Sequence, residues 1–68
     1  MDNRELYSQM VKTRSKVFFF DLKENLNGRF LKVTEKSGDK RNTIMIPEEG
    51  LEEFVNALQS MLHYKGEE

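Results

Sequence analysis

Residues 17–34 contain two alternating segments joined by a short polar turn, and this pattern constrains the fold of the chain most strongly. In the first segment, Val-Phe-Phe-Phe-Asp-Leu-Lys, period-2 alternation places Phe18, Phe20 and Leu22 on one face of a strand. The turn contains two asparagines and Gly28, residue types that accept positive φ. The pattern therefore predicts an antiparallel β-hairpin with one core face.

The other face of this hairpin is unusual for a solvent-facing surface. In the return segment Leu31 and Val33 share the core side, so Phe30 and Lys32 point outward. Two cations, an amide and a ring lie next to the turn: Lys23, Asn25, Arg29 and Phe30. Such a group suits an unpaired nucleotide. The residues alone leave open that Phe30 packs in a dimer interface and that Asn25 only shapes the turn, and we interpret Phe19 as structural.

The remaining segments predict two more strands and one helix. Pro47 ends the last strand because proline has no ladder donor, and apolar residues at helical spacing follow Glu48 and Glu49, which suit the first turn of a helix. A charged segment, 35–41, is typical of a mobile hairpin loop. We expect an α+β fold in one domain, residues 1–68: a four-stranded antiparallel sheet followed by one C-terminal helix. The expected strands span about 6–13, 16–23, 29–36 and 42–46, and the helix about 48–65.

The size and charge of the chain indicate self-association and a basic sheet. With 68 residues, of which 37% are hydrophobic, a lone domain with one bare sheet face buries too little apolar surface. The net charge is −1, yet residues 12–41 carry nine Lys or Arg against four Asp or Glu, whereas residues 42–68 carry one Lys against six Glu. Since salt screens exposed charges beyond about 10 Å, a ligand on the strands experiences a positive surface. A solvated mixed-charge surface is the alternative.

Several functional classes find no support in the residues. Cysteine is absent and His63 is the single histidine, so we expect no metal and no cofactor. No nucleophile–base pair or phosphate-cradling glycine loop is present, so we expect no enzyme and no small-molecule substrate. No apolar run approaches the roughly 18 residues of a membrane span, and residues 1–5 lack signal-peptide order. We therefore expect a cytoplasmic protein with no membrane partner.

The hairpin and the segments after it resemble the PUR (purine-rich element binding) repeat proteins. The resemblance covers roughly residues 6–65 and rests on Lys-x-Asn-x-x-Gly-Arg-Phe, from Lys23 to Phe30, after an aromatic-rich strand. The other matching segments are Phe18–Asn25, Gly28–Val33, Ile44–Gly50 and Glu53-Phe54. Family members often carry Arg or Lys immediately before the glycine, where this chain has Asn27.

This resemblance implies both an assembly and a ligand. The family fold intertwines two β-β-β-β-α repeats into a Whirly-like domain, so a chain with one repeat is expected to form an intertwined homodimer. The implied ligand is single-stranded, purine-rich DNA or RNA, and the implied role is transcriptional or post-transcriptional regulation. The expected nucleic-acid-binding residues are Ser15, Lys16, Lys23, Asn25, Arg29, Phe30 and Lys32. The alternative is a small protein–protein interaction module without nucleic-acid binding.

Overall fold

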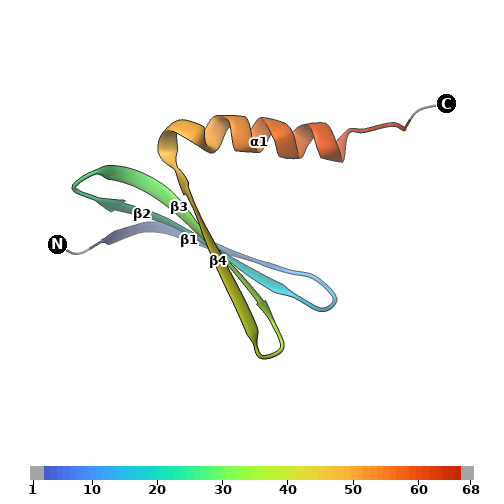
Figure 1. Ribbon diagram of the computed structural model, residues 1–68, viewed down its shortest axis with the longest axis horizontal. Helices are drawn as coiled ribbons and strands as arrows, with labels where there is room; N and C mark the ends of the chain where they lie inside the picture. Colours follow the sequence, from blue (N-terminus) through green and yellow to red (C-terminus); the bar gives the residue numbers. More distant parts are fainter. Residues whose placement is uncertain (1–2, 67–68) are drawn as a thin grey trace.

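A computed structural model describes residues 3–66 and shows a four-stranded sheet followed by one helix (Figure 1). All neighbouring strands are antiparallel, in the order β1-β2-β3-β4. The elements are β1 (Arg4–Lys12), β2 (Val17–Asn25), β3 (Gly28–Ser37), β4 (Lys40–Pro47) and α1 (Glu48–Leu62). The expected α+β fold is confirmed. Residues 1, 2, 67 and 68 of the predicted unit lie outside the described residues.

The segment 35–41 is not the loop that its composition predicts. Strands β3 and β4 continue to a two-residue turn, with Ser37 opposite Lys40 and Gly38 at a φ of 61°. Backbone groups in a hairpin gain ladder partners whatever their side chains are, so a charged, polar segment can extend two strands. The predicted loop is therefore wrong, and the basic residues in it have fixed positions on the sheet.

The helix ends earlier than its apolar spacing predicts. It stops at Leu62 instead of residue 65, and its last turn tightens: the amide of His63 donates to the carbonyl of Gln59 at 3.0 Å, and that of Tyr64 donates to Met61 at 3.3 Å. The last turn contains no basic residue to interact with the C-terminal carbonyls.

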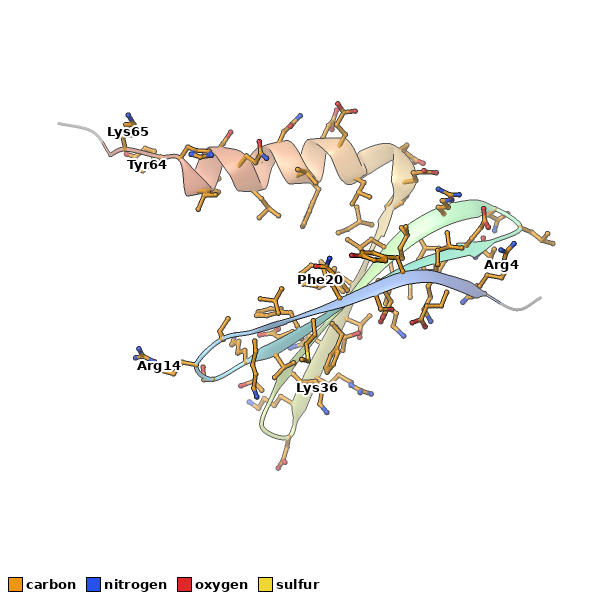
Figure 2. All side chains as sticks on the ribbon, turned by 180° about the vertical axis from the view of Figure 1, so that it is seen from behind. Arg4, Arg14, Phe20, Lys36, Tyr64 and Lys65 are labelled. Atoms are coloured by element: carbon orange, nitrogen blue, oxygen red, sulfur yellow. The ribbon has the colours of Figure 1, made fainter. Side chains whose placement is uncertain are left out.

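The register of the strands divides the sheet into two chemically different faces. One face, called the apolar face, consists of Tyr7, Gln9, Val11, Phe18, Phe20, Leu22, Leu31, Val33, Ile44 and Ile46. The opposite face, called the basic face, includes Lys12, Phe19, Asp21, Lys23, Phe30, Lys32, Thr34, Lys36, Arg41, Thr43 and Met45. The helix lies on the side of the sheet that carries Phe20, and Lys36 lies on the other side (Figure 2).

Helix α1 covers little of the apolar face. It approaches β3 and β4 but neither of the other strands, and it runs away from the sheet toward its C-terminus (Figure 1). None of its residues is buried, and its large apolar side chains after Leu51 are exposed, from 37% for Phe54 to 77% for Leu62. Among the described residues Ile46 is the one buried hydrophobic side chain. Most of the apolar face therefore lacks a covering layer within the chain.

The dimensions of the chain show the same lack of a core. Its radius of gyration is 14.4 Å, whereas a compact domain of this length has about 11 Å. Its accessible surface is 6040 Å², about 1,500 Å² more than a compact monomer of this mass exposes. A single chain is thus a sheet and a helix that do not close on each other.

Replacing either of two glycines with alanine should change stability in opposite directions, although both have room for a Cβ atom. Gly28 has a φ of 126°, Gly50 lies in the first turn of α1, and a Cβ added at either position meets no atom within 4 Å. Gly28→Ala should lower the free energy of unfolding by about 1–3 kcal/mol through backbone strain, and Gly50→Ala should raise it by about 0.5–1 kcal/mol. Urea unfolding at one fixed protein concentration measures both; equal effects of the two substitutions would contradict this assignment.

Candidate nucleic-acid interface

Four of the predicted site residues lie together on the basic face. Lys23 on β2 is directly opposite Phe30 on β3, Lys32 follows two residues along β3, and Asn25 ends β2. Residues directly opposite in an antiparallel pair have Cβ atoms about 4.5–5.5 Å apart. All four side chains are half-buried, so the ring of Phe30 is partly accessible beside an ammonium group. The face therefore presents a ring, two cations and an amide within a few residues of one turn.

Asn25 both shapes the turn and retains binding capacity. Its Oδ1 accepts a hydrogen bond from the backbone amide of Asn27 at 2.8 Å, which closes an Asx turn before Gly28. The Nδ2 group takes no part in this turn. Asn25 therefore holds the β2–β3 hairpin through its oxygen and retains two N–H donors for acceptor atoms of a base, such as purine N7.

Arg29 does not join this group, because adjacent residues of a strand point to opposite faces. It lies on the side of the apolar face, where its Nε is 3.5 Å from Glu24 Oε2. Arg4 approaches the other oxygen of Glu24 at 3.7 Å. The sequence places Arg29 next to Phe30 along the chain, and the structure separates the two across the sheet.

Ser15 and Lys16 lie at the other end of β2, in the β1–β2 turn. Asn25 follows Lys16 by nine residues, a distance of about 30 Å in an extended strand. Thr13 holds this turn: its backbone amide donates to the carbonyl of Lys16 at 2.8 Å, and its Oγ1 accepts from the amide of Lys16 at 3.1 Å. Within one chain, then, the two predicted basic turns form two separate sites.

Lys16 is engaged by a carboxylate. Its Nζ donates to Glu35 Oε2 at 2.6 Å, and Asn42 Nδ2 donates to Glu35 Oε1 at 3.4 Å. The hydrogen bond from Lys16, then that from Asn42 and the charge of Lys16, hold the pKa of Glu35 below its ordinary value of 4.5. A ligand phosphate therefore has to compete with Glu35 for this ammonium group. Because the ion pair is accessible to solvent, it contributes little free energy, and the phosphate can replace the carboxylate.

Two further cations belong to the basic face although they were expected in a loop. Lys36 is directly opposite Arg41 in the β3–β4 register. Lys36 follows Lys32 by four residues on β3, so continuing the alternation past Thr34 would have placed it on this face. The charged composition of segment 35–41 instead predicts a loop, in which alternation does not apply.

Among residues 3–66, no three His, Cys, Asp or Glu side chains gather closely enough to hold a metal ion. Over the same residues, no helix combines the length and apolar content that crossing a membrane requires.

These features define a class of protein: a small α+β module with one open, largely basic face of a sheet. Comparison with known families gives a more specific result. The family model described as PurA ssDNA and RNA-binding protein matches residues 1–68, and the chain belongs to this family. The resemblance found in the Lys-x-Asn-x-x-Gly-Arg-Phe element is thereby confirmed.

Similar proteins are considerably longer. The chain is 44% identical over 52 residues to transcription factor Pur-alpha 1 of Arabidopsis thaliana, covering 76% of this chain and 18% of that protein. It is 32% identical over 72 residues to the transcriptional activator protein Pur-alpha of Mus musculus, and equally to that of Homo sapiens, covering 96% of this chain and 22% of each. The chain therefore spans about a fifth of the length of these relatives.

The pair formed by Lys16 and Glu35 predicts a pH dependence. The pKa of Glu35 is lower in the folded than in the unfolded chain, so the pair stabilises the fold above pH 4.5, and this contribution is lost as the pH falls through the folded pKa. Lys16→Gln should move the pKa of Glu35 up toward 4.5. Side-chain carboxyl NMR measures the titration midpoint, with Lys40→Gln as the control. A midpoint at 4.5 in the unsubstituted chain would show that the pair does not persist in solution.

Proposed function

We propose that this chain binds single-stranded, purine-rich DNA or RNA as a homodimer and acts in transcriptional or post-transcriptional regulation. The observation that carries the proposal is the division of the sheet: Lys23, Asn25, Phe30 and Lys32 share one face, and most residues of the other face are apolar. The description of the family and the names of the relatives support it. The proposal includes no catalytic step.

Binding on the basic face depends on stacking and on phosphate neutralisation. A base stacked on an aromatic ring contributes roughly 1–3 kcal/mol, and stacking on Phe30 requires a base that is not paired within a duplex. Lys23 and Lys32 lie beside Phe30 and neutralise the phosphates that flank the stacked base. Helix α1, which contains four glutamates, lies on the side of the sheet that carries Phe20, and Lys36 lies on the other side (Figure 2).

The preference for purines has two sources. It follows from the family and from the Nδ2 donors of Asn25, which make no hydrogen bond within residues 3–66 and match purine N7 acceptors. Asn27 replaces the basic residue that family members often carry, so this chain has one cation fewer at the turn. Asn offers no bidentate guanidinium fork, and a weaker guanine contact is expected than in members with Arg.

A second copy of the chain is the proposed cover for the apolar face. Each chain exposes about 1,500 Å² more accessible surface than a compact monomer of its mass. If a dimer buries this excess from both chains, its interface buries about 3,000 Å², which is within the range of obligate interfaces. Hollows of about 240 Å³ and 130 Å³ on this face are lined mainly by apolar side chains, among them Phe20 and Ile44, and have room for side chains of a partner. The exposed apolar stripe of α1 has the matching chemistry.

Paired charge substitutions on the two faces test where nucleic acid binds. Lys23→Gln with Lys32→Gln should reduce the slope of log affinity against log salt by about 1.4 per protomer, because each phosphate contact to a single strand contributes about 0.7. Arg4→Gln with Arg29→Gln removes the same charge from the opposite face and should leave the slope nearly unchanged. Fluorescence anisotropy with a purine-rich oligonucleotide gives both slopes. Equal reductions in the two variants would exclude binding confined to the basic face.

Substitutions on adjacent residues of α1 test the dimer. Leu58 belongs to the apolar stripe and is 55% exposed in the single chain, whereas Gln59 lies on the polar side. Leu58→Glu should raise the dimer dissociation constant at least about 100-fold, because an apolar contact is lost and a carboxylate must be desolvated. Gln59→Glu should change it little. Sedimentation velocity over a concentration series provides the constants, and a folded, compact monomer in the unsubstituted chain would contradict the proposed dimer.

A further inference from the structure

The basic face contains a hollow that the predicted turn residues do not line, apart from Lys32. Its volume is about 260 Å³. It lies across β2, β3 and β4, toward the β3–β4 turn and away from Phe30. Its lining residues are Phe19, Asp21, Lys32, Thr34, Lys36, Arg41 and Thr43.

One end of the hollow is formed by two cations that face each other. Lys36 on β3 and Arg41 on β4 are directly opposite in the register, and such like-charge pairs destabilise a sheet. Neither side chain takes part in an ion pair with the residues between 3 and 66. An unfavourable local choice of this kind is typical of a functional position, because an anion between the two cations removes the repulsion.

The floor and the far end of the hollow have different chemistry. Phe19 and Thr43 flank Thr34 on the neighbouring strands, and Thr34, 7% exposed, is the most buried polar side chain on the face. Asp21, at the far end, accepts a hydrogen bond from Ser8 Oγ at 2.7 Å. A carboxylate repels phosphate, so the anion-binding end is the one at Lys36 and Arg41. The middle of the hollow offers one face of a half-buried ring and two hydroxyl groups.

We propose that this hollow is a second nucleotide subsite, which binds one nucleotide of the same single strand that stacks on Phe30. Lys36 and Arg41 bind its phosphate, its base lies over Phe19, and the hydroxyls of Thr34 and Thr43 hydrogen-bond its sugar or base edge. The proposal rests on the function proposed above and adds residues that the Lys-x-Asn-x-x-Gly-Arg-Phe element does not contain.

The subsite also sets the direction in which the strand crosses the protein. Phe30 and Lys36 are six residues apart on β3, about 20 Å in an extended strand. A nucleic acid that occupies both positions therefore runs along β3, over the basic face. Oligonucleotides too short to span this distance lose the contribution of one subsite.

The experiment compares two double variants in anisotropy titrations with long and short purine-rich oligonucleotides. Lys36→Gln with Arg41→Gln should reduce the salt slope by about 1.4 per protomer with the long oligonucleotide, because two phosphate contacts are lost. The control, Arg14→Gln with Lys40→Gln, removes two cations from turn positions outside the hollow and should change the slope little. Because a repulsive pair is removed, the melting temperature of the first variant should equal or exceed that of the unsubstituted chain, which excludes misfolding as the cause.

A second pair of variants tests the ring. Phe19→Tyr keeps an aromatic face and should bind like the unsubstituted chain, whereas Phe19→Leu should weaken binding of the long oligonucleotide roughly 5- to 150-fold, the equivalent of one lost base stack. Equal binding of both Phe19 variants, together with an unchanged salt slope for Lys36→Gln with Arg41→Gln, would overturn the subsite.

Phe30→Ala separates the two proposals. If it weakens binding while the hollow variants do not, the proposed function stands and the subsite fails. If the unsubstituted chain binds no oligonucleotide, the proposed function itself fails.

Discussion

The alternation of side chains along β2 and β3 is the constraint on which the rest of the structure depends. Because the register pairs Phe20 with Val33 and Lys23 with Phe30, apolar residues gather on one side of the sheet and cations on the other. A slip of one residue would exchange these sets and destroy both surfaces. The Asx turn of Asn25 and the positive φ of Gly28 hold this register at the hairpin end.

The two faces require different partners for physical reasons. Exposure of the apolar face to water is unfavourable, and the short helix of the same chain does not cover it. The basic face gains little from burial, because burial would remove water from its cations and its rings are already half-buried. Protein is therefore the suitable partner for the first face and a polyanion for the second, and the two associations do not compete for the same residues.

Much of this organisation can be predicted from the sequence. The hairpin, the order of elements and the grouping of Lys23, Phe30 and Lys32 follow from period-2 alternation, which is strong where aromatic and aliphatic residues supply it. Closeness along the chain groups Arg29 with Phe30, whereas the same alternation puts these adjacent residues on opposite faces. Alternation continued past Thr34 places Lys36 on the basic face, but the position of Arg41 depends on the β3–β4 register, which composition does not reveal in a polar segment. The separation of Lys16 from Asn25 depends on the length of β2. The sequence pattern predicts a strand that ends at about residue 23, whereas β2 continues to Asn25.

Lysine footprinting with an amine-reactive reagent and mass spectrometry tests the division of the faces most directly. The chain has lysines on the basic face, in the β1–β2 turn, at the β3–β4 turn and after the helix. With a saturating purine-rich single strand, the account predicts protection of Lys23, Lys32 and Lys36, with Lys40 and Lys65 as reactive as in the free protein. Protection of Lys40 and Lys65 while Lys23 and Lys32 remain reactive would contradict it.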